Sequence, residues 1–105
     1  MKIITYYELN PDLDPSAIGN LAAKFVSKGM YPAKGVKEIA WYNTAADYWG
    51  ITVTEVENEE AFLNSVNMFR IAMPGVFKVL KSSLVMEVKD VIPAIAKLEK
   101  LVKGK

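Results

Sequence analysis

The chain is 105 residues long, which is the length of one domain. Hydrophobic residues make up 51% of it and charged residues 24%, as in a folded globular protein rather than a disordered or collagen-like one. Thirteen basic and twelve acidic residues give a net charge of +1, which argues against a strongly basic nucleic-acid surface. The chain has neither cysteine nor histidine. It therefore lacks thiol nucleophiles, disulfides, zinc clusters and any mechanism that needs an imidazole near neutral pH.

The N-terminal segment differs from a targeting sequence. Its short apolar run is broken by Glu8 and followed by Asn10 and Pro11, whereas a signal peptide needs a longer apolar stretch and a small-residue cleavage site. No stretch approaches the roughly eighteen apolar residues of a membrane span. Because no cysteine is present to form a disulfide framework, we expect a cytoplasmic protein. The near-neutral charge and the lack of a long apolar stretch further predict neither a nucleic-acid partner nor a membrane partner.

The first part of the chain predicts a strand and then a helix. Lys2 to Glu8 is rich in β-branched and aromatic residues, which favour a strand. Asp14-Pro15 is typical of a helix start, and apolar residues from Ile18 to Val26 follow at helical spacing. Gly29 suits a left-handed cap at the end of this helix.

The middle of the chain predicts a hairpin followed by a second helix. Lys37 to Asn43 and Tyr48 to Glu55 are both typical of strands, and the short connection between them favours an antiparallel pair. Asn58 opens the second helix, and this helix should stop before Pro74. One further strand and a final helix are expected after it.

The fourth strand is predicted over Phe77 to Val88, with a bend or bulge near Ser82-Ser83. Asp90 is expected to cap the last helix, and Pro93 is tolerable in the first turn of a helix. Apolar residues at Ile95, Leu98 and Val102 form a stripe on this helix. The lysines near its C-terminus complement the helix dipole.

The predicted order is strand, helix, strand, strand, helix, strand and a final helix. This is the split β-α-β arrangement of the ferredoxin-like fold, with an extra C-terminal helix. We therefore expect an α+β protein with a four-stranded antiparallel sheet. Residues 1–105 should form a single domain, since no linker, repeat or low-complexity segment interrupts them.

Alternation along the strands indicates what each face of the sheet meets. In the third strand the apolar set Trp49, Ile51 and Val53 should lie under the helices, and the opposite face should carry Thr52 and its neighbours. Neither face is polar, yet helices cover only one face in this layout. The uncovered face is then a large apolar patch, which predicts at least a homodimer through the sheet.

The pattern resembles the dimeric α+β-barrel superfamily, a group of small proteins of about this length. Its members include muconolactone-isomerase-like, stress-responsive and antibiotic-biosynthesis-monooxygenase-like proteins. The resemblance rests on the opening strand Ile3-Ile4-Thr5-Tyr6-Tyr7, the hairpin strands 39–42 and 48–53, and the helix start Glu59-Glu60-Ala61-Phe62. It implies two stacked sheets, a ligand site in a cleft or inside the barrel, and activity without metal or organic cofactor in several members. No catalytic residue carries over, because the histidine that some members use has no counterpart in this sequence.

The candidate ligand-binding residues are aromatic, hydroxyl and charged side chains on the predicted sheet and second helix. They are Tyr6, Glu38, Tyr42, Tyr48, Thr52, Arg70 and Glu87. Aromatic rings can line a pocket for a flat or apolar ligand, although ordinary core and dimer packing explains the same residues. A desolvated carboxylate gains a raised pKa and can act as a base, although a surface position at a strand end also explains each glutamate.

Arg70 is the only arginine of the chain and has apolar neighbours. It can bind a ligand carboxylate or an acid of a second copy, or lie along its helix with its charged end in water. Three functions stay open: a small-molecule-binding or regulatory dimer with an aromatic-lined cavity, a cofactor-independent enzyme using a buried carboxylate and tyrosines, and a structural oligomer. Binding of a small apolar or aromatic ligand ranks first, and neither metal nor cofactor is expected.

Overall fold

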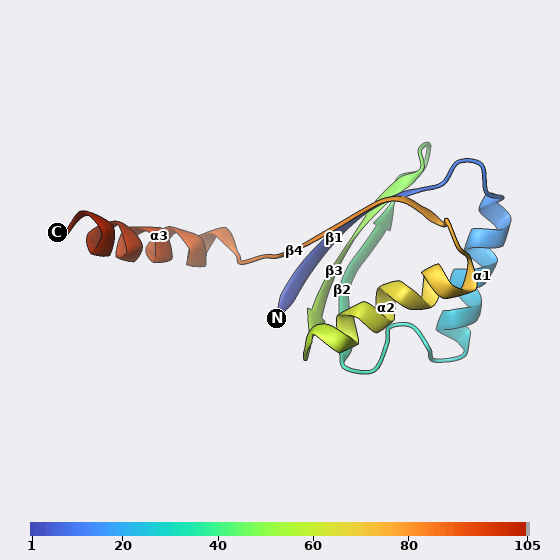
Figure 1. The fold of residues 1–105 in the computed structure, drawn as a ribbon, viewed down its shortest axis with the longest axis horizontal. Coiled ribbons are helices and arrows are strands. Elements are labelled where there is room, and N and C mark those ends of the chain that lie inside the picture. The colour runs from blue at the N-terminus through green and yellow to red at the C-terminus, as the bar shows by residue number, and fades with distance from the viewer. Residues whose placement is uncertain (105) are drawn as a thin grey trace.

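The computed structural model describes residues 1–104 as a four-stranded sheet, two helices packed on it and a third helix that projects away (Figure 1). The elements follow the predicted order. They are β1 (Lys2–Leu9), α1 (Pro15–Ser27), β2 (Val36–Asn43), β3 (Trp49–Val56), α2 (Glu59–Ala72), β4 (Phe77–Leu84) and α3 (Val88–Lys103). The predicted α+β, ferredoxin-like architecture with an extra C-terminal helix is thereby confirmed.

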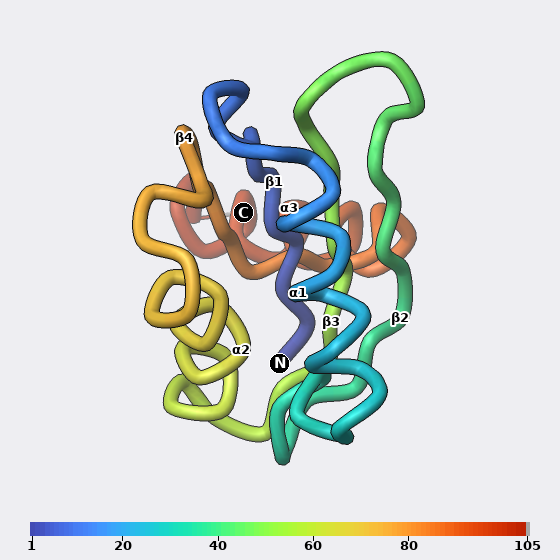
Figure 2. The backbone as a smooth tube through the Cα atoms, turned by 90° about the vertical axis from the view of Figure 1, so that its right-hand side faces the viewer, coloured from blue at the N-terminus to red at the C-terminus, as the bar shows by residue number. Residues whose placement is uncertain are grey.

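The sheet has the strand order β2-β3-β1-β4, and all neighbouring strands are antiparallel. Helices α1 and α2 both cover one face of it. Viewed at right angles to Figure 1, α1 lies nearest the viewer, the strands lie behind it and α3 is farthest away (Figure 2). We call the helix-covered side the inner face and the opposite side the outer face.

The starts of both packed helices are fixed by side-chain caps. The Asp14 carboxylate accepts the amide of Ser16 at 2.9 Å, and Pro15 occupies the first helical position. Asn58 caps α2 by accepting the amide of Ala61 at 2.9 Å. Gly29 follows α1 with a φ of 69°, as a left-handed terminating residue does.

The C-terminal elements differ from their predicted bounds. β4 ends at Leu84 instead of Val88, because Leu84 pairs with Ile3 and β1 offers almost no chain beyond that point. The helix then begins at Val88 with Glu87 as its N-cap, so Asp90 lies inside the first turn instead of capping it. Pro93 lies within the helix, where it lacks the N–H of a regular turn.

The predicted face assignment of β3 was wrong. Gly50, Thr52 and Thr54 face the helices, whereas Trp49 and Ile51 belong to the outer face. The more apolar set does not mark the core here, because both faces are apolar and aromatic residues of neighbouring strands fill the inner one. Alternation separates the two sets of side chains on each strand, but it does not indicate which set the helices cover.

A bulge in β2 interrupts the alternation of its side chains between the two faces. The register with β3 shifts between Glu38 and Ala40, which leaves Ile39 without a partner. Glu38 and Trp41 therefore both lie on the inner face, although strict alternation separates them. Glu38 also shares no face with Glu87, which lies between β4 and α3.

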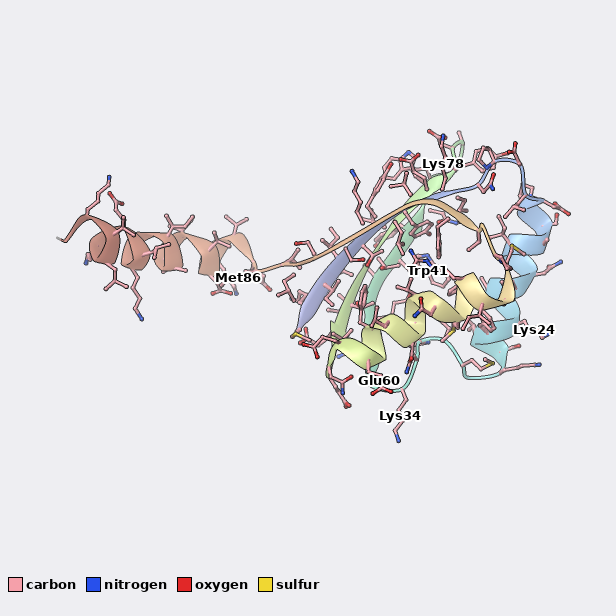
Figure 3. All side chains as sticks on the ribbon, in the orientation of Figure 1. Lys24, Lys34, Trp41, Glu60, Lys78 and Met86 are labelled. Atoms are coloured by element: carbon pink, nitrogen blue, oxygen red, sulfur yellow. The ribbon has the colours of Figure 1, made fainter. Side chains whose placement is uncertain are left out.

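The core joins α1, α2 and the two loops that follow them. Phe25, Tyr31, Phe69 and Val76 form its buried cluster. The Phe25 and Phe69 rings meet edge to face, with centroids 5.1 Å apart. By contrast, the α3 side chains radiate into solvent beyond Met86 (Figure 3).

Candidate functional site

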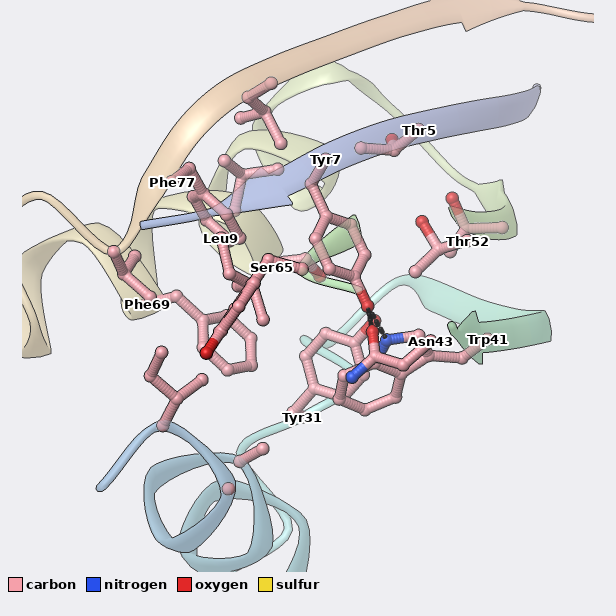
Figure 4. A pocket seen from close by; sticks show the side chains of 18 of the residues that line it. Thr5, Tyr7, Leu9, Tyr31, Trp41, Asn43, Thr52, Ser65, Phe69 and Phe77 are labelled. Atoms are coloured by element: carbon pink, nitrogen blue, oxygen red, sulfur yellow. Dashed lines mark hydrogen bonds between the residues drawn. The ribbon is translucent and has the colours of Figure 1, made fainter. Parts of the chain in front are cut away.

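A cavity of about 270 Å³ lies between the inner face of the sheet and helices α1 and α2 (Figure 4). Aromatic and aliphatic side chains make up most of its walls, and a few amide and hydroxyl groups interrupt them. The aromatic members are Tyr7, Tyr31, Trp41, Tyr48, Phe62, Phe69 and Phe77. Such a lining, apolar with a few convergent polar groups, is typical of small-molecule sites.

Three polar groups in the wall form one hydrogen-bonded chain. The Trp41 indole nitrogen donates to the Tyr7 hydroxyl at 2.8 Å, and that hydroxyl in turn donates to the Asn43 carbonyl oxygen (Figure 4). Because its oxygen is already engaged, the Asn43 side chain offers its amide N–H groups as donors. The sheet thus presents an oriented donor at the edge of an apolar cavity.

Gly50 makes this arrangement possible. Tyr7 and Asn43 are its two cross-strand partners, so the three residues lie on one rung of the sheet. A Cβ atom on Gly50 falls 2.4 Å from the Tyr7 hydroxyl and 2.5 Å from the Asn43 oxygen. No side chain fits between them, so glycine is required here for close approach rather than for an unusual backbone angle.

Two unpartnered polar atoms lie further along the inner face. Glu38 and Thr54 are cross-strand partners, and among residues 1–104 neither Glu38 Oε1 nor Thr54 Oγ1 has a hydrogen-bond partner. Burial raises the pKa of the Glu38 carboxyl, and the nearby Tyr31 hydroxyl acts in the opposite direction. Thr54 lines the cavity, whereas Glu38 does not.

The buried phenols of the site stay protonated. Burial raises the pKa of Tyr31, and the nearby Glu38 carboxylate raises it further. Burial also raises the pKa of Tyr7, although the hydrogen bond from Trp41 acts against this shift. Both hydroxyls therefore serve as neutral hydrogen-bonding groups and not as phenolate bases at neutral pH.

The mouth of the cavity is marked by those lining residues that remain exposed. Pro15 and Gly19 border it on α1, Asn43 borders it at the end of β2, and Asp47 and Tyr48 border it on the β2–β3 connection. Asp47 is the only acidic or basic side chain among the described residues of the lining. The entrance consequently disfavours an anionic group.

Two of the predicted site residues line the cavity, and a third lies beside it. Tyr48 and Thr52 contribute to the wall, while Glu38 lies behind Thr54. Tyr6 and Tyr42 lie together on the outer face instead. Tyr6 donates a hydrogen bond to Glu8 at 2.9 Å, and Tyr42 is 67% exposed.

The remaining two candidates lie away from the cavity. Arg70 is exposed near the end of α2 and lines no part of the cavity wall. Glu87 forms ion pairs with Lys89 at 3.3 Å and Lys2 at 3.9 Å. Glu87 is the N-cap residue of α3, and this structural role accounts for its position.

Residues that the candidate set missed provide the centre of the site. Tyr7, Trp41 and Asn43 form the hydrogen-bonded chain, and Tyr31 reaches the cavity from a loop. Alternation in β1 places Tyr7 opposite Tyr6, so the sequence held part of this signal. No pattern in the sequence predicts the bulge in β2 that precedes Trp41.

Residues 1–104 offer neither a metal site nor a membrane-spanning helix. No group of three or more acidic side chains in this range is placed to hold a metal ion. None of the helices in this range combines the length and apolar character needed to cross a membrane.

Comparison with known proteins supports the fold. The solved structure of Rv0793 from Mycobacterium tuberculosis is similar, with a TM-score of 0.53 and 13% sequence identity. The match covers 82% of this chain and 94% of that chain. No family model matches the sequence, and no curated protein matches it either. At this level of identity the likeness concerns the α+β fold alone.

Proposed function

We propose that the protein binds a small, flat, mainly apolar or aromatic molecule in the cavity between its sheet and helices α1 and α2. The observation that supports this most directly is the hydrogen-bonded chain of Trp41, Tyr7 and Asn43 in an otherwise apolar wall. A packed core needs no such hydrogen-bonded chain ending on an exposed amide at the mouth of an open cavity. A binding site does, because such a donor fixes the orientation of a ligand.

The polar groups define the ligand further. The Asn43 amide donates to a carbonyl or hydroxyl oxygen on the ligand, while aromatic rings pack on its flat faces. Asp47 at the mouth and the absence of basic groups among the described lining residues disfavour a carboxylate or phosphate. The expected class is a neutral aromatic alcohol or ketone.

The alternative is a cofactor-independent enzyme that uses Glu38 as a base. Its raised pKa and unpartnered oxygen favour this reading. However, Glu38 does not line the cavity, and a base must reach the proton that it abstracts. Binding therefore ranks first.

The functional unit is proposed to be a homodimer that buries the outer face, as in the dimeric α+β barrels that the sequence resembles. On β1, β2 and β3 the central rungs of this face carry Ile4, Tyr6, Ala40, Tyr42, Ile51 and Val53, while β4 adds Ser83 and Lys81 at one edge. No helix covers them in residues 1–104 (Figure 1). A contiguous apolar surface of this kind favours a protein partner.

Binding is tested with 2-naphthol as the probe, a flat aromatic alcohol. The two tryptophans provide an internal control, because Trp41 lines the cavity and Trp49 lies on the outer face. In a ¹H–¹⁵N spectrum we expect saturable movement of the Trp41 indole signal and little movement of the Trp49 signal. Trp49→Phe assigns the two signals.

A matched pair of variants then tests the location. Gly19 lines the cavity, and a Cβ atom there meets nothing within 4 Å. Gly19→Leu fills the space, whereas Gly19→Ala leaves it open, and both changes favour the helix. We expect Gly19→Leu to abolish the response and Gly19→Ala to retain it. Equal responses of the two variants, or no response of the parent protein at millimolar 2-naphthol, overturn the proposal.

A further inference from the structure

Helix α3 extends from the end of β4 and packs on no other helix or strand of residues 1–104 (Figures 1 and 3). It has 16 residues, and none of them is buried. An isolated helix of this length is marginal in water, since helices in proteins gain most of their stability from packing. A helix at Val88–Lys103 therefore implies a surface that covers it.

One side of α3 is apolar and exposed, as expected for a surface that packs on another protein surface. Apart from Leu101, its branched apolar residues recur at spacings of three and four and form a stripe, which Glu99 interrupts near the C-terminal end. The stripe consists of Val88, Val91, Ile92, Ile95, Leu98 and Val102. Ile95 is 59% exposed and Leu98 is 58% exposed. The lysines at 89, 97 and 100 occupy the opposite side, where they stay in water.

The accessible surface of the chain is larger than that of a compact monomer, and the excess estimates how much surface a partner covers. The chain exposes 7400 Å², which is roughly 1,500 Å² more than the roughly 5,900 Å² expected for a folded monomer of 11.7 kDa. Its radius of gyration is 17.1 Å, against roughly 13 Å for a compact domain of this length. Two chains that each bury this excess share roughly 3,000 Å², which lies in the range of obligate homodimers.

We propose that α3 is an exchanged arm, whose apolar stripe packs on a second copy of this chain while the partner's arm packs on the first. This rests on the homodimer proposed above and assigns α3 a part in it. Leu84 and Met86 lie where the chain leaves the sheet for α3, and they are 67% and 59% exposed. Leu84 pairs with Ile3 and so belongs to the inner face, which means that the arm adds apolar surface of its own to that of the outer face.

A second copy fits the stripe better than a lipid surface does. Helices that lie in membrane interfaces usually carry Trp or Phe on the apolar side. The segment 88–103 contains no aromatic residue, and its stripe is built of valine, isoleucine and leucine. Branched aliphatic side chains of this kind pack closely against a protein surface.

The test uses the full chain and two matched double variants. Ile95→Gln with Leu98→Gln alters the stripe, whereas Lys97→Gln with Lys100→Gln alters the opposite side of the same turns. Light scattering gives the oligomeric state, and hydrogen exchange over residues 88–103 reports whether α3 is covered. We expect the parent and the lysine variant to be dimers with a protected α3. We expect the stripe variant to dimerise on the order of 100-fold more weakly or worse, with rapid exchange in α3.

The outcomes separate this inference from the proposed sheet dimer. A parent dimer whose α3 exchanges as fast as a free peptide overturns the arm exchange and leaves the sheet dimer standing. If the stripe variant dimerises as tightly as the parent, the arm exchange is likewise overturned and the sheet dimer stands. A monomeric parent overturns both. A monomer whose α3 becomes protected only on phosphatidylserine vesicles assigns the stripe to a lipid surface and also overturns the inference.

Discussion

The two faces of the sheet are built from the same strands but serve different ends. On the inner face, the rung of Asn43, Gly50 and Tyr7 carries a hydrogen-bonded chain and borders a cavity. On the next rung, Tyr42 and Ile51 point outward and meet no element of their own chain in residues 1–104. Adjacent residues of one strand thus border a cavity that contains a few polar groups on one side and an apolar surface on the other.

The difference shows why the more apolar face of a sheet need not face its helices. An inner face that borders a cavity needs threonine, asparagine and tyrosine groups to orient a ligand. In the proposed dimer the outer face is buried only after assembly, which accounts for the apolar surface that it carries. Four predictions test this division, from the largest expected effect to the smallest.

The largest effect is expected at the centre of the outer face. Ile51→Asp places a carboxylate where the proposed dimer buries it without a partner, which should weaken the dimer by about 3 kcal/mol or more. Light scattering should show monomers at micromolar concentration, while the inner face still binds 2-naphthol. The control Asn20→Asp adds the same charge to an exposed position of α1. Unchanged dimerisation of Ile51→Asp contradicts the assignment of this face.

A smaller effect is expected at the close approach on the inner face. Gly50→Val forces the Tyr7 hydroxyl and Asn43 apart, because even a Cβ atom collides with both. The free energy of unfolding should fall by about 1–3 kcal/mol, and chemical denaturation measures it. Gly19→Ala serves as the control, since the space around Gly19 is open. If Gly50→Val unfolds at the denaturant concentration of the parent, the described rung is wrong.

Removing a single tyrosine hydroxyl from one face or the other tests the roles of the two faces with a smaller change. Tyr7→Phe leaves the Trp41 indole and the Asn43 carbonyl without their partner, at a cost of about 1–3 kcal/mol. Affinity for 2-naphthol should fall as well, because Asn43 loses its fixed orientation. Tyr42→Phe is the matched change on the outer face, and it should leave binding at the inner face unchanged. Equal binding by both variants argues against an oriented amide.

The smallest effect concerns pH. Burial raises the pKa of Glu38 above its ordinary value of 4.5, so folding favours the protonated form. The stabilising contribution is present below about pH 4.5 and is lost as the pH rises through the raised pKa. Glu38→Gln should therefore be more stable than the parent at neutral pH and equally stable in acid. A stability difference that does not change with pH, measured by thermal unfolding, contradicts this reading.

The order and type of the elements followed from the sequence because local signals set them. The Asp14-Pro15 and Asn58 caps were sufficient to place the starts of α1 and α2. The end of β4 did not follow, since it depends on where β1 stops offering partners. Local patterning contains no such long-range information.

The site was predicted only in part, for a physical reason. Two candidate ligand-binding residues, Thr52 and Tyr48, line the cavity. Three further lining residues, Tyr7, Trp41 and Asn43, were not among the candidates. Their convergence needs the bulge at Ile39 and the register across Gly50, which are properties of strand pairing. A face can be inferred from alternation, but alternation does not indicate which of two apolar faces the helices cover.

Native mass spectrometry of the freshly purified protein tests the division between the two faces most directly, because one spectrum reports both assembly and ligand. The account predicts an ion of twice the chain mass that carries a small molecule, and loss of that molecule in Gly19→Leu while the dimer persists. A parent protein found only as a single chain without a bound molecule contradicts it.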